Sequence, residues 1–147
     1  HPQQQIQRAL QALKQLPETC LVRHSALYRS VPLGPPQQPD YINAVAVLVT
    51  QLPPLTLLAQ LQLLEQQQGR VRTAVQWGPR TLDLDILLYD NQQSQEPLLT
   101  LPHAGLYERN FVLYPLYECT PDLVLPDGQC LSHLIQQCGT EGLYRIT

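Results

Sequence analysis

Apolar side chains in two stretches of the chain recur every three or four residues, which is the spacing of one face of an α-helix. The first stretch predicts a helix over 2–16, which Pro17 ends. The second is rich in leucine and predicts a helix over 55–69. Two shorter apolar stretches, 110–119 and 131–138, predict helices near the C-terminus.

Three other stretches have the β-branched and apolar composition of strands, and they cover 20–30, 42–52 and 81–89. A shorter apolar stretch at 96–103 predicts a return strand. The segment 31–41 holds four of the fourteen prolines and is therefore predicted to be a loop. Connections of this length are often lids or binding loops.

The order of the predicted elements is helix, strand, strand, helix, strand and then mixed elements. This is the order of a βαββαβ unit whose first strand is missing. It predicts an α+β sandwich in which helices pack on one face of a mostly antiparallel sheet.

The composition narrows the classes of function. The 147 residues, 44% of them hydrophobic, fit a single domain over 1–147. No apolar run reaches the roughly 20 residues that cross a bilayer, and no secretory signal pattern opens the chain. The four cysteines lack zinc-site spacing and are expected to be free thiols in a reducing cytosol. A net charge of −3 and a single phenylalanine argue against nucleic-acid binding, including a ferredoxin-like RNA-binding domain.

Two aspartates, Asp83 and Asp85, lie within the predicted strand 81–89. Side chains two residues apart project from the same face of a strand, so the two carboxylates project together, while Leu84 and Ile86 point to the core. Two such close carboxylates repel each other, and a divalent cation removes this repulsion. Hard oxygen ligands without His or Cys favour Mg²⁺. The alternative is an exposed strand edge on which both groups are solvated.

Four arginines, Arg70, Arg72, Arg80 and Arg109, bracket the aspartates. Arginine is preferred where a planar side chain must hold a phosphate with two hydrogen bonds. Two acids with several arginines are typical of phosphoryl transfer with Mg²⁺. Because neither a Walker-type nor a kinase-type glycine-rich loop is present, a nucleotide must be bound by another architecture.

Several further residues have the chemistry of a ligand site. Trp77 and Phe111, the only tryptophan and phenylalanine, could hold a flat heterocycle between their rings, although lone aromatic residues are more often part of the core. Asn43 could bind the edge of such a ring, or it could simply end a strand. Gln62 and Glu65 lie one helical turn apart, and the spacing alone favours a solvated helix face.

The stretch "WGPRTLDLDILLYD" closely resembles the signature of 6-hydroxymethyl-7,8-dihydropterin pyrophosphokinase, an enzyme family of folate biosynthesis. The stretches "YRSVPLGPPQQPDYINAVAVL", "LEQQQGRVR", "LTLPH", "RNFVLYPLYE" and "PDLVLPDG" also resemble family segments, in the same order, so the resemblance covers essentially the whole chain. It implies a ferredoxin-like α+β fold, two Mg²⁺ ions, and transfer of pyrophosphate from ATP to the pterin hydroxymethyl group with release of AMP. The alternative is an inactive relative that binds pterin or ATP without turnover.

The resemblance also implies roles for individual residues. Asp83 and Asp85 bind both metal ions, and Arg70 and Arg80 take part in the chemistry. The implied ATP-site residues are Gln62, Glu65, Arg70, Arg72, Trp77, Arg80, Ile86, Thr100, His103 and Arg109. The implied pterin-site residues are Ser30, Leu33, Tyr41, Asn43, Trp77, Asp83 and Phe111, with Trp77 and Phe111 on opposite faces of the ring.

The chain departs from the family pattern at a few points. The family begins with a strand and a Gly-Ser-Asn turn before the first helix, whereas this chain opens at that helix, so we expect the 147-residue chain to be unstable or inactive alone. Gln76 and Ala104 replace residues that are often basic and aromatic, and we expect weaker ATP binding rather than lost chemistry. Ser30 in place of threonine is a mild change. We further expect a cytoplasmic monomer that binds no membrane.

Overall fold

The computed structural model describes residues 2–31, 40–70 and 82–146. The helices within these ranges are α1 (Pro2–Leu13), α2 (Pro54–Arg70), α3 (Asn110–Cys119) and α4 (Leu131–Gln137). The strands within them are β1 (Thr19–His24), β2 (Tyr28–Ser30), β3 (Tyr41–Asn43), β4 (Ala46–Thr50), β5 (Ser94–Glu96), β6 (Leu99–Leu101) and β7 (Leu143–Arg145). All four predicted helices are confirmed, and so is the α+β class.

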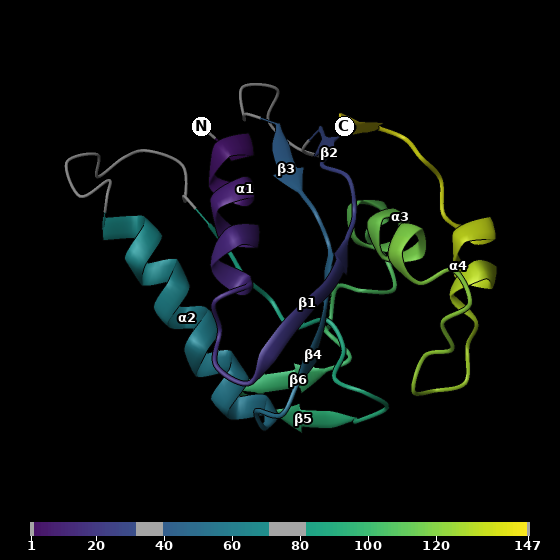
Figure 1. Cartoon of the computed structure of the whole chain (residues 1–147). Helices are drawn as coiled ribbons and strands as arrows, with labels where there is room; N and C mark the ends of the chain where they lie inside the picture. Colours follow the sequence, from purple (N-terminus) through teal and green to yellow (C-terminus); the bar gives the residue numbers. More distant parts are fainter. Residues whose placement is uncertain (1, 32–39, 71–81, 147) are drawn as a thin grey trace.

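The strands form three small antiparallel sheets. β1 pairs with β4, β2 lies between β3 and β7, and β5 pairs with β6. In Figure 1 the β1–β4 ribbon runs through the middle of the molecule, with α1 and α2 on one side and α3 and α4 on the other. The sheet of β2, β3 and β7 continues from the upper end of this ribbon.

Two apolar clusters form the core, one on each face of β4. Ala46 and Leu48 pack against a cluster that includes Leu13 of α1 and Leu61 of α2. Val47 packs against the other cluster, which is built largely from α3 and α4. The prediction that helices cover one face of the sheet is therefore wrong. The physical reason is that an apolar strand with no polar alternation is suited to burial on both faces.

The predicted strand 81–89 is also not found, since residues 82–89 have no strand pairing in the part of the chain that the structure describes. A strand needs a hydrogen-bonded neighbour, and apolar composition alone cannot supply one. Polar contacts from elsewhere hold this segment instead. The Leu87 carbonyl accepts a hydrogen bond from the His103 N–H at 2.9 Å, and the Tyr89 hydroxyl donates to the Leu52 carbonyl.

Each of the two N-terminal strand predictions is confirmed in position but divides into two strands. The first breaks at 25–27 and the second at 44–45. Ser25 explains both breaks, because its N–H donates to the Val45 carbonyl at 2.8 Å and its hydroxyl oxygen accepts from the Val45 N–H at 2.9 Å. The side chain thus replaces a backbone partner at this point, and the paired strands bend together.

Two general features of the fold agree with the composition. None of the helices in the described ranges is both long and apolar enough to cross a membrane. All four cysteines are free thiols.

Candidate active site

Asp83 and Asp85 are two residues apart and both lie on the exposed side of the segment 82–89. Both residues are exposed, the side chain of Asp85 by 60%, whereas Leu84 is half-buried and Ile86 is 7% exposed within the core. The predicted alternation is thus confirmed, although the segment is not paired as a strand. Two solvent-facing carboxylates are in this way presented from one backbone segment.

Glu65 fixes the backbone between these two aspartates. Its carboxylate Oε2 accepts a hydrogen bond from the N–H of Leu84. Glu65 belongs to α2 and is half-buried, so the expectation of a solvated helix face is wrong for this residue. The helical spacing could not reveal the contact, because the partner lies 19 positions further along the chain.

His103 brings a second candidate residue to the aspartates. Its Nε2 lies 3.6 Å from Asp85 Oδ2, and its Nδ1 accepts a hydrogen bond from the Gly105 N–H at 3.0 Å. That second bond requires an unprotonated Nδ1, so Nε2 carries the ring hydrogen and faces Asp85 as a donor. The imidazole is therefore oriented for an acidic group or for a phosphate oxygen.

Arg109 and Phe111 lie together at the start of α3. The Arg109 guanidinium carbon is 5.8 Å from the centroid of the Phe111 ring. Arg109 also lies directly over Gly105, where an added Cβ would come within 2.6 Å of the guanidinium. A cation and an aromatic face are thus available in one place, and the cation lies over Gly105, two residues beyond His103.

Ser30, a predicted pterin-site residue, has a buried hydroxyl group. It lies at the end of β2, opposite Tyr41 of β3, while Asn43 lies opposite Tyr28. Ser30 is only 5% exposed, and its hydroxyl is a buried group without a hydrogen-bond partner among the described residues. Buried polar groups are nearly always paired, so this hydroxyl is a candidate for a contact with a ligand.

Tyr28, two residues before Ser30, has a strongly shifted titration. Burial and then the hydrogen bond to Glu118 raise the pKa of Tyr28 from 10.0 to about 12. Because the folded pKa lies above the unfolded one, the stabilisation is complete below pH 10 and is lost as the pH rises toward the folded pKa.

We expect the free energy of unfolding of the wild type to fall by about 2 kcal/mol more than that of Tyr28→Phe between about pH 10 and about pH 12. Urea unfolding of both proteins over a series of pH values measures this difference. Curves that stay parallel over the whole range would contradict the shifted pKa.

The remaining predicted residues are spread more widely. Gln62 and Thr100 are exposed, and the side chain of Ile86 is in the core, so only its backbone is available to a ligand. Arg70 is the last residue of α2. Outside the described residues lie Leu33, Arg72, Trp77 and Arg80, together with Gln76.

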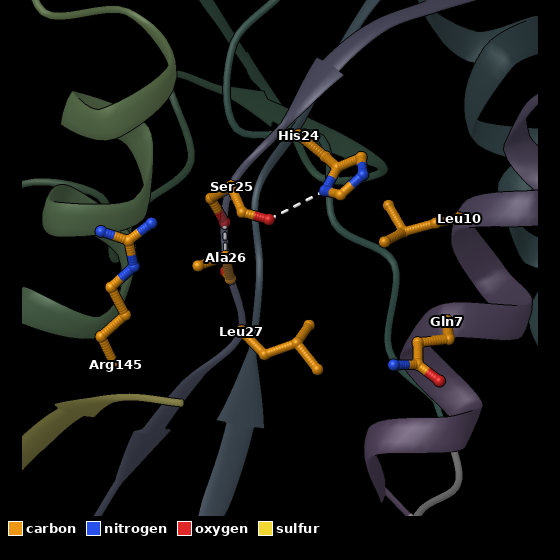
Figure 2. Close-up of a pocket in the computed structure, with 7 residues that line it drawn as sticks. All are labelled: Gln7, Leu10, His24, Ser25, Ala26, Leu27 and Arg145. Atoms are coloured by element: carbon orange, nitrogen blue, oxygen red, sulfur yellow. Dashed lines mark hydrogen bonds between the residues drawn. The ribbon is translucent and has the colours of Figure 1, made fainter. Parts of the chain in front are cut away.

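A separate cavity of about 350 Å³ lies between α1 and the bend at 25–27. Figure 2 shows Gln7 and Leu10 of α1 on one side of it and His24 to Leu27 on the other. None of the predicted site residues within the described ranges lines this cavity. It is therefore not the place where the aspartates and the histidine gather.

The donor atoms at the aspartates fit a hard cation such as Mg²⁺. Asp83 and Asp85 offer carboxylate oxygens, which Mg²⁺ prefers. Within the described ranges no group of three or more His, Cys, Asp or Glu could enclose a metal. Mg²⁺ commonly binds through one or two carboxylates and completes its shell with water and substrate phosphates, so two carboxylates are sufficient.

Comparison with known proteins decides the family. The model of the family described as 7,8-dihydro-6-hydroxymethylpterin-pyrophosphokinase matches residues 1–121. The chain belongs to this family. As a member of the pyrophosphokinase family, it is 54% identical to the 2-amino-4-hydroxy-6-hydroxymethyldihydropteridine pyrophosphokinase of Pseudomonas aeruginosa over 99% of this chain and 89% of that protein.

A second relative of the same name comes from Haemophilus influenzae. It is 52% identical over 99% of this chain and 90% of its own length. A third, from Synechocystis, is 44% identical over 84% of this chain and 63% of its own length. The resemblance seen in the sequence is thus confirmed at the level of the pyrophosphokinase family.

Proposed function

We propose that this chain transfers pyrophosphate from ATP to the hydroxymethyl group of 6-hydroxymethyl-7,8-dihydropterin, giving the pterin diphosphate and AMP in folate biosynthesis. The observation that carries this proposal is the family match over 1–121, joined by relatives that are more than half identical over nearly the whole chain. The exposed pair Asp83 and Asp85, with His103 beside it, provides a suitable place for the phosphates.

The triphosphate of ATP would be held by cationic and hydrogen-bonding side chains around the aspartates. His103 is oriented by Gly105 to donate from Nε2, and the Arg109 guanidinium is exposed close to it in sequence. Arg70, Arg72 and Arg80 would add further positive charge. The other proposed ATP contacts are Gln62, Trp77, Ile86 and Thr100, whereas Glu65 would act on the ATP site through the backbone of Leu84.

Asp83 and Asp85 would hold two Mg²⁺ ions against the triphosphate. When bound, these ions neutralise charge on the phosphate oxygens and so favour attack by a neutral hydroxyl. Glu65 contributes by fixing the backbone from which both carboxylates project. Two is the proposed number of ions.

The pterin would lie between Phe111 and Trp77, with Ser30, Leu33, Tyr41, Asn43 and Asp83 around it. The buried Ser30 hydroxyl has no hydrogen-bond partner among the described residues, and a polar group on the edge of the pterin ring would supply one. The bound hydroxymethyl oxygen then forms a bond to the β-phosphorus and releases its proton to water. The bond from this phosphorus to the α,β-bridging oxygen breaks, and AMP leaves with the electron pair.

Formation of AMP from ATP tests the proposal, and this assay and those below use a version of the protein that also carries the family's N-terminal strand and turn. We expect AMP to appear only when 6-hydroxymethyl-7,8-dihydropterin is present, and its rate to rise with added Mg²⁺. Binding of pterin and ATP without AMP would favour an inactive relative. Sedimentation velocity of the purified protein at several concentrations tests the proposed monomer, because the sedimentation coefficient of a monomer is that of a single chain at every concentration.

We expect Phe111→Ala to raise the KM for the pterin by about tenfold, because stacking of a heterocycle on an aromatic ring contributes about 1–3 kcal/mol. Phe111→Tyr keeps the ring and serves as the matched control. The KM values for both substrates are measured by AMP release. An unchanged pterin KM in Phe111→Ala would remove this ring from the proposed site.

A further inference from the structure

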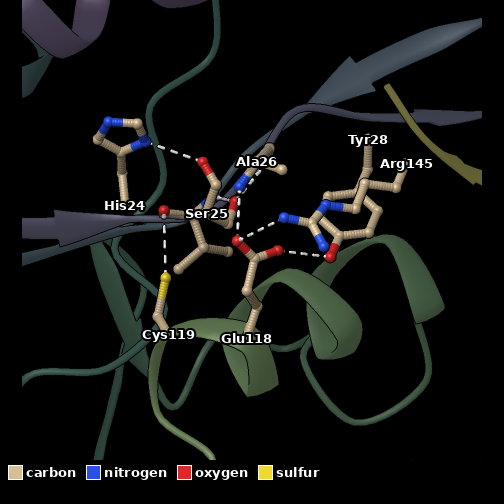
Figure 3. Close-up of polar contacts among 8 residues, drawn as sticks. His24, Ser25, Ala26, Tyr28, Glu118, Cys119 and Arg145 are labelled. Atoms are coloured by element: carbon tan, nitrogen blue, oxygen red, sulfur yellow. Dashed lines mark hydrogen bonds and ion pairs between the residues drawn. The ribbon is translucent and has the colours of Figure 1, made fainter. Parts of the chain in front are cut away.

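Glu118, on α3, joins three separate backbone segments with one carboxylate. Its Oε2 accepts a hydrogen bond from the Ala26 N–H at 2.9 Å, and its Oε1 accepts one from the Tyr28 hydroxyl at 2.6 Å. Arg145 of β7 lies 3.8 Å from Oε2. Figure 3 shows the carboxylate between these groups, with the α3 helix below them. The Glu118 side chain is 28% exposed, and its bond to the Tyr28 hydroxyl is partly buried, whereas the Arg145 side chain is 61% exposed.

A second connection joins the other end of α3 to the other end of β2. The Asn110 side-chain amide donates to the carbonyls of Gly139 and Glu141, at 3.1 and 3.0 Å. The next residue, Gly142, accepts a hydrogen bond from the Val31 N–H at 2.9 Å. Hydrogen bonds therefore hold α3 and β2 together at both ends, with the start of α3 near the end of β2.

The proposed pterin-site residues lie directly beside these hydrogen-bonded points. Phe111 follows Asn110 on α3, and Ser30 precedes Val31 on β2. Phe111 lies seven residues before Glu118, which is two helical turns and therefore the same side of α3. Tyr28 and Ser30 are two residues apart and both buried, so they share one face of β2.

We propose that Glu118 is a positioning residue of the pterin site, whose carboxylate sets the spacing between the Phe111 ring and the Ser30 hydroxyl. This inference rests on the proposed function, because that function makes Phe111 and Ser30 two walls of one site. Glu118 itself touches no substrate. It acts by holding α3 in one position relative to β2.

Because Glu118 makes two hydrogen bonds, glutamine and alanine at this position are expected to have different effects. Glutamine at 118 can accept from the Ala26 N–H through its oxygen, and its amide can donate to the Tyr28 oxygen, so both connections survive without the charge. Alanine makes neither bond and leaves the Ala26 N–H without its acceptor. Glu141→Ala is the control, since Glu141 is exposed in the C-terminal segment and contributes its backbone carbonyl to the contact with Asn110.

The experiment measures the Kd of 6-hydroxymethyl-7,8-dihydropterin by fluorescence and the KM of both substrates by AMP release. In Glu118→Ala we expect the pterin Kd and KM to rise about tenfold, because small displacements of positioning groups carry costs of this size, with the ATP KM unchanged. Glu118→Gln is expected to restore the wild-type pterin Kd, and Glu141→Ala to equal the wild type. Tyr28→Phe removes one of the two bonds and should give an intermediate rise, which keeps the test available if Glu118→Ala does not fold.

Three results would overturn the inference. One is an unchanged pterin Kd in both Glu118→Ala and Tyr28→Phe. Another is an equal rise in the KM of ATP, which would indicate a general loss of structure. The third is a Glu118→Gln protein as weak as Glu118→Ala. Failure of the proposed function would give a different result, because the wild type itself would then release no AMP in response to the pterin.

Discussion

Replacing both Asp83 and Asp85 with asparagine is expected to lower the rate of pyrophosphate transfer on the order of 10³-fold or more. Both side chains are exposed on one side of the segment 82–89. The double substitution removes two negative charges and leaves the size of the two side chains almost unchanged. Asparagine is a poor ligand for Mg²⁺ compared with a carboxylate, so the triphosphate charge would be left largely unneutralised. The measurement is the initial rate of AMP release at saturating pterin and at several Mg²⁺ concentrations.

Asp90→Asn provides the matched control for this double variant. Asp90 directly follows this segment, is exposed, and has a φ of 50°, a left-handed conformation that asparagine adopts readily. We expect Asp90→Asn to retain the wild-type rate and the wild-type Mg²⁺ dependence. If the double variant transferred pyrophosphate as fast as Asp90→Asn, the aspartates would have no part in the chemistry.

The elements that could be predicted from the sequence are those whose signal is local. The spacing of apolar residues is sufficient for α1 and α2, because Leu13 and Leu61 face the core whatever lies beyond them. The segment 82–89 has an equally clear composition, but a strand exists only when another strand pairs with it. The two-residue spacing predicts the exposed face of Asp83 and Asp85 correctly, whereas the composition predicts strand pairing that the described residues do not show.

The same distinction holds for the candidate site. Asp83 and Asp85 are two residues apart, so their shared direction follows from backbone geometry alone. The Glu118 contacts, in contrast, join residues about ninety positions apart, and no spacing rule connects Glu118 with Ala26. The Ser30 hydroxyl has no partner among the described residues, and this is likewise a property of packing, because it depends on what surrounds the side chain.

Glu65→Ala is expected to lower the rate of pyrophosphate transfer by about 10²-fold, through a displacement of the aspartates and not through a lost contact with ATP. The Glu65 carboxylate accepts the Leu84 N–H, which lies between Asp83 and Asp85, so its loss frees the backbone that carries both. Glutamine at 65 can accept the same hydrogen bond through its amide oxygen. We therefore expect Glu65→Gln to keep most of the activity, within about threefold of the wild type.

The comparison of Glu65→Gln with Glu65→Ala separates positioning from direct binding of ATP. Positioning predicts that the two variants differ strongly in kcat and in the Mg²⁺ concentration needed for half-maximal rate. A direct contact between the Glu65 charge and ATP predicts instead that both variants raise the KM of ATP alike. Gln66→Ala, at the next and exposed position of α2, is the control for the helix itself. Urea unfolding of each variant shows whether any loss of rate exceeds the loss of folded protein, and a rate that follows the folded fraction alone would rule out the positioning role.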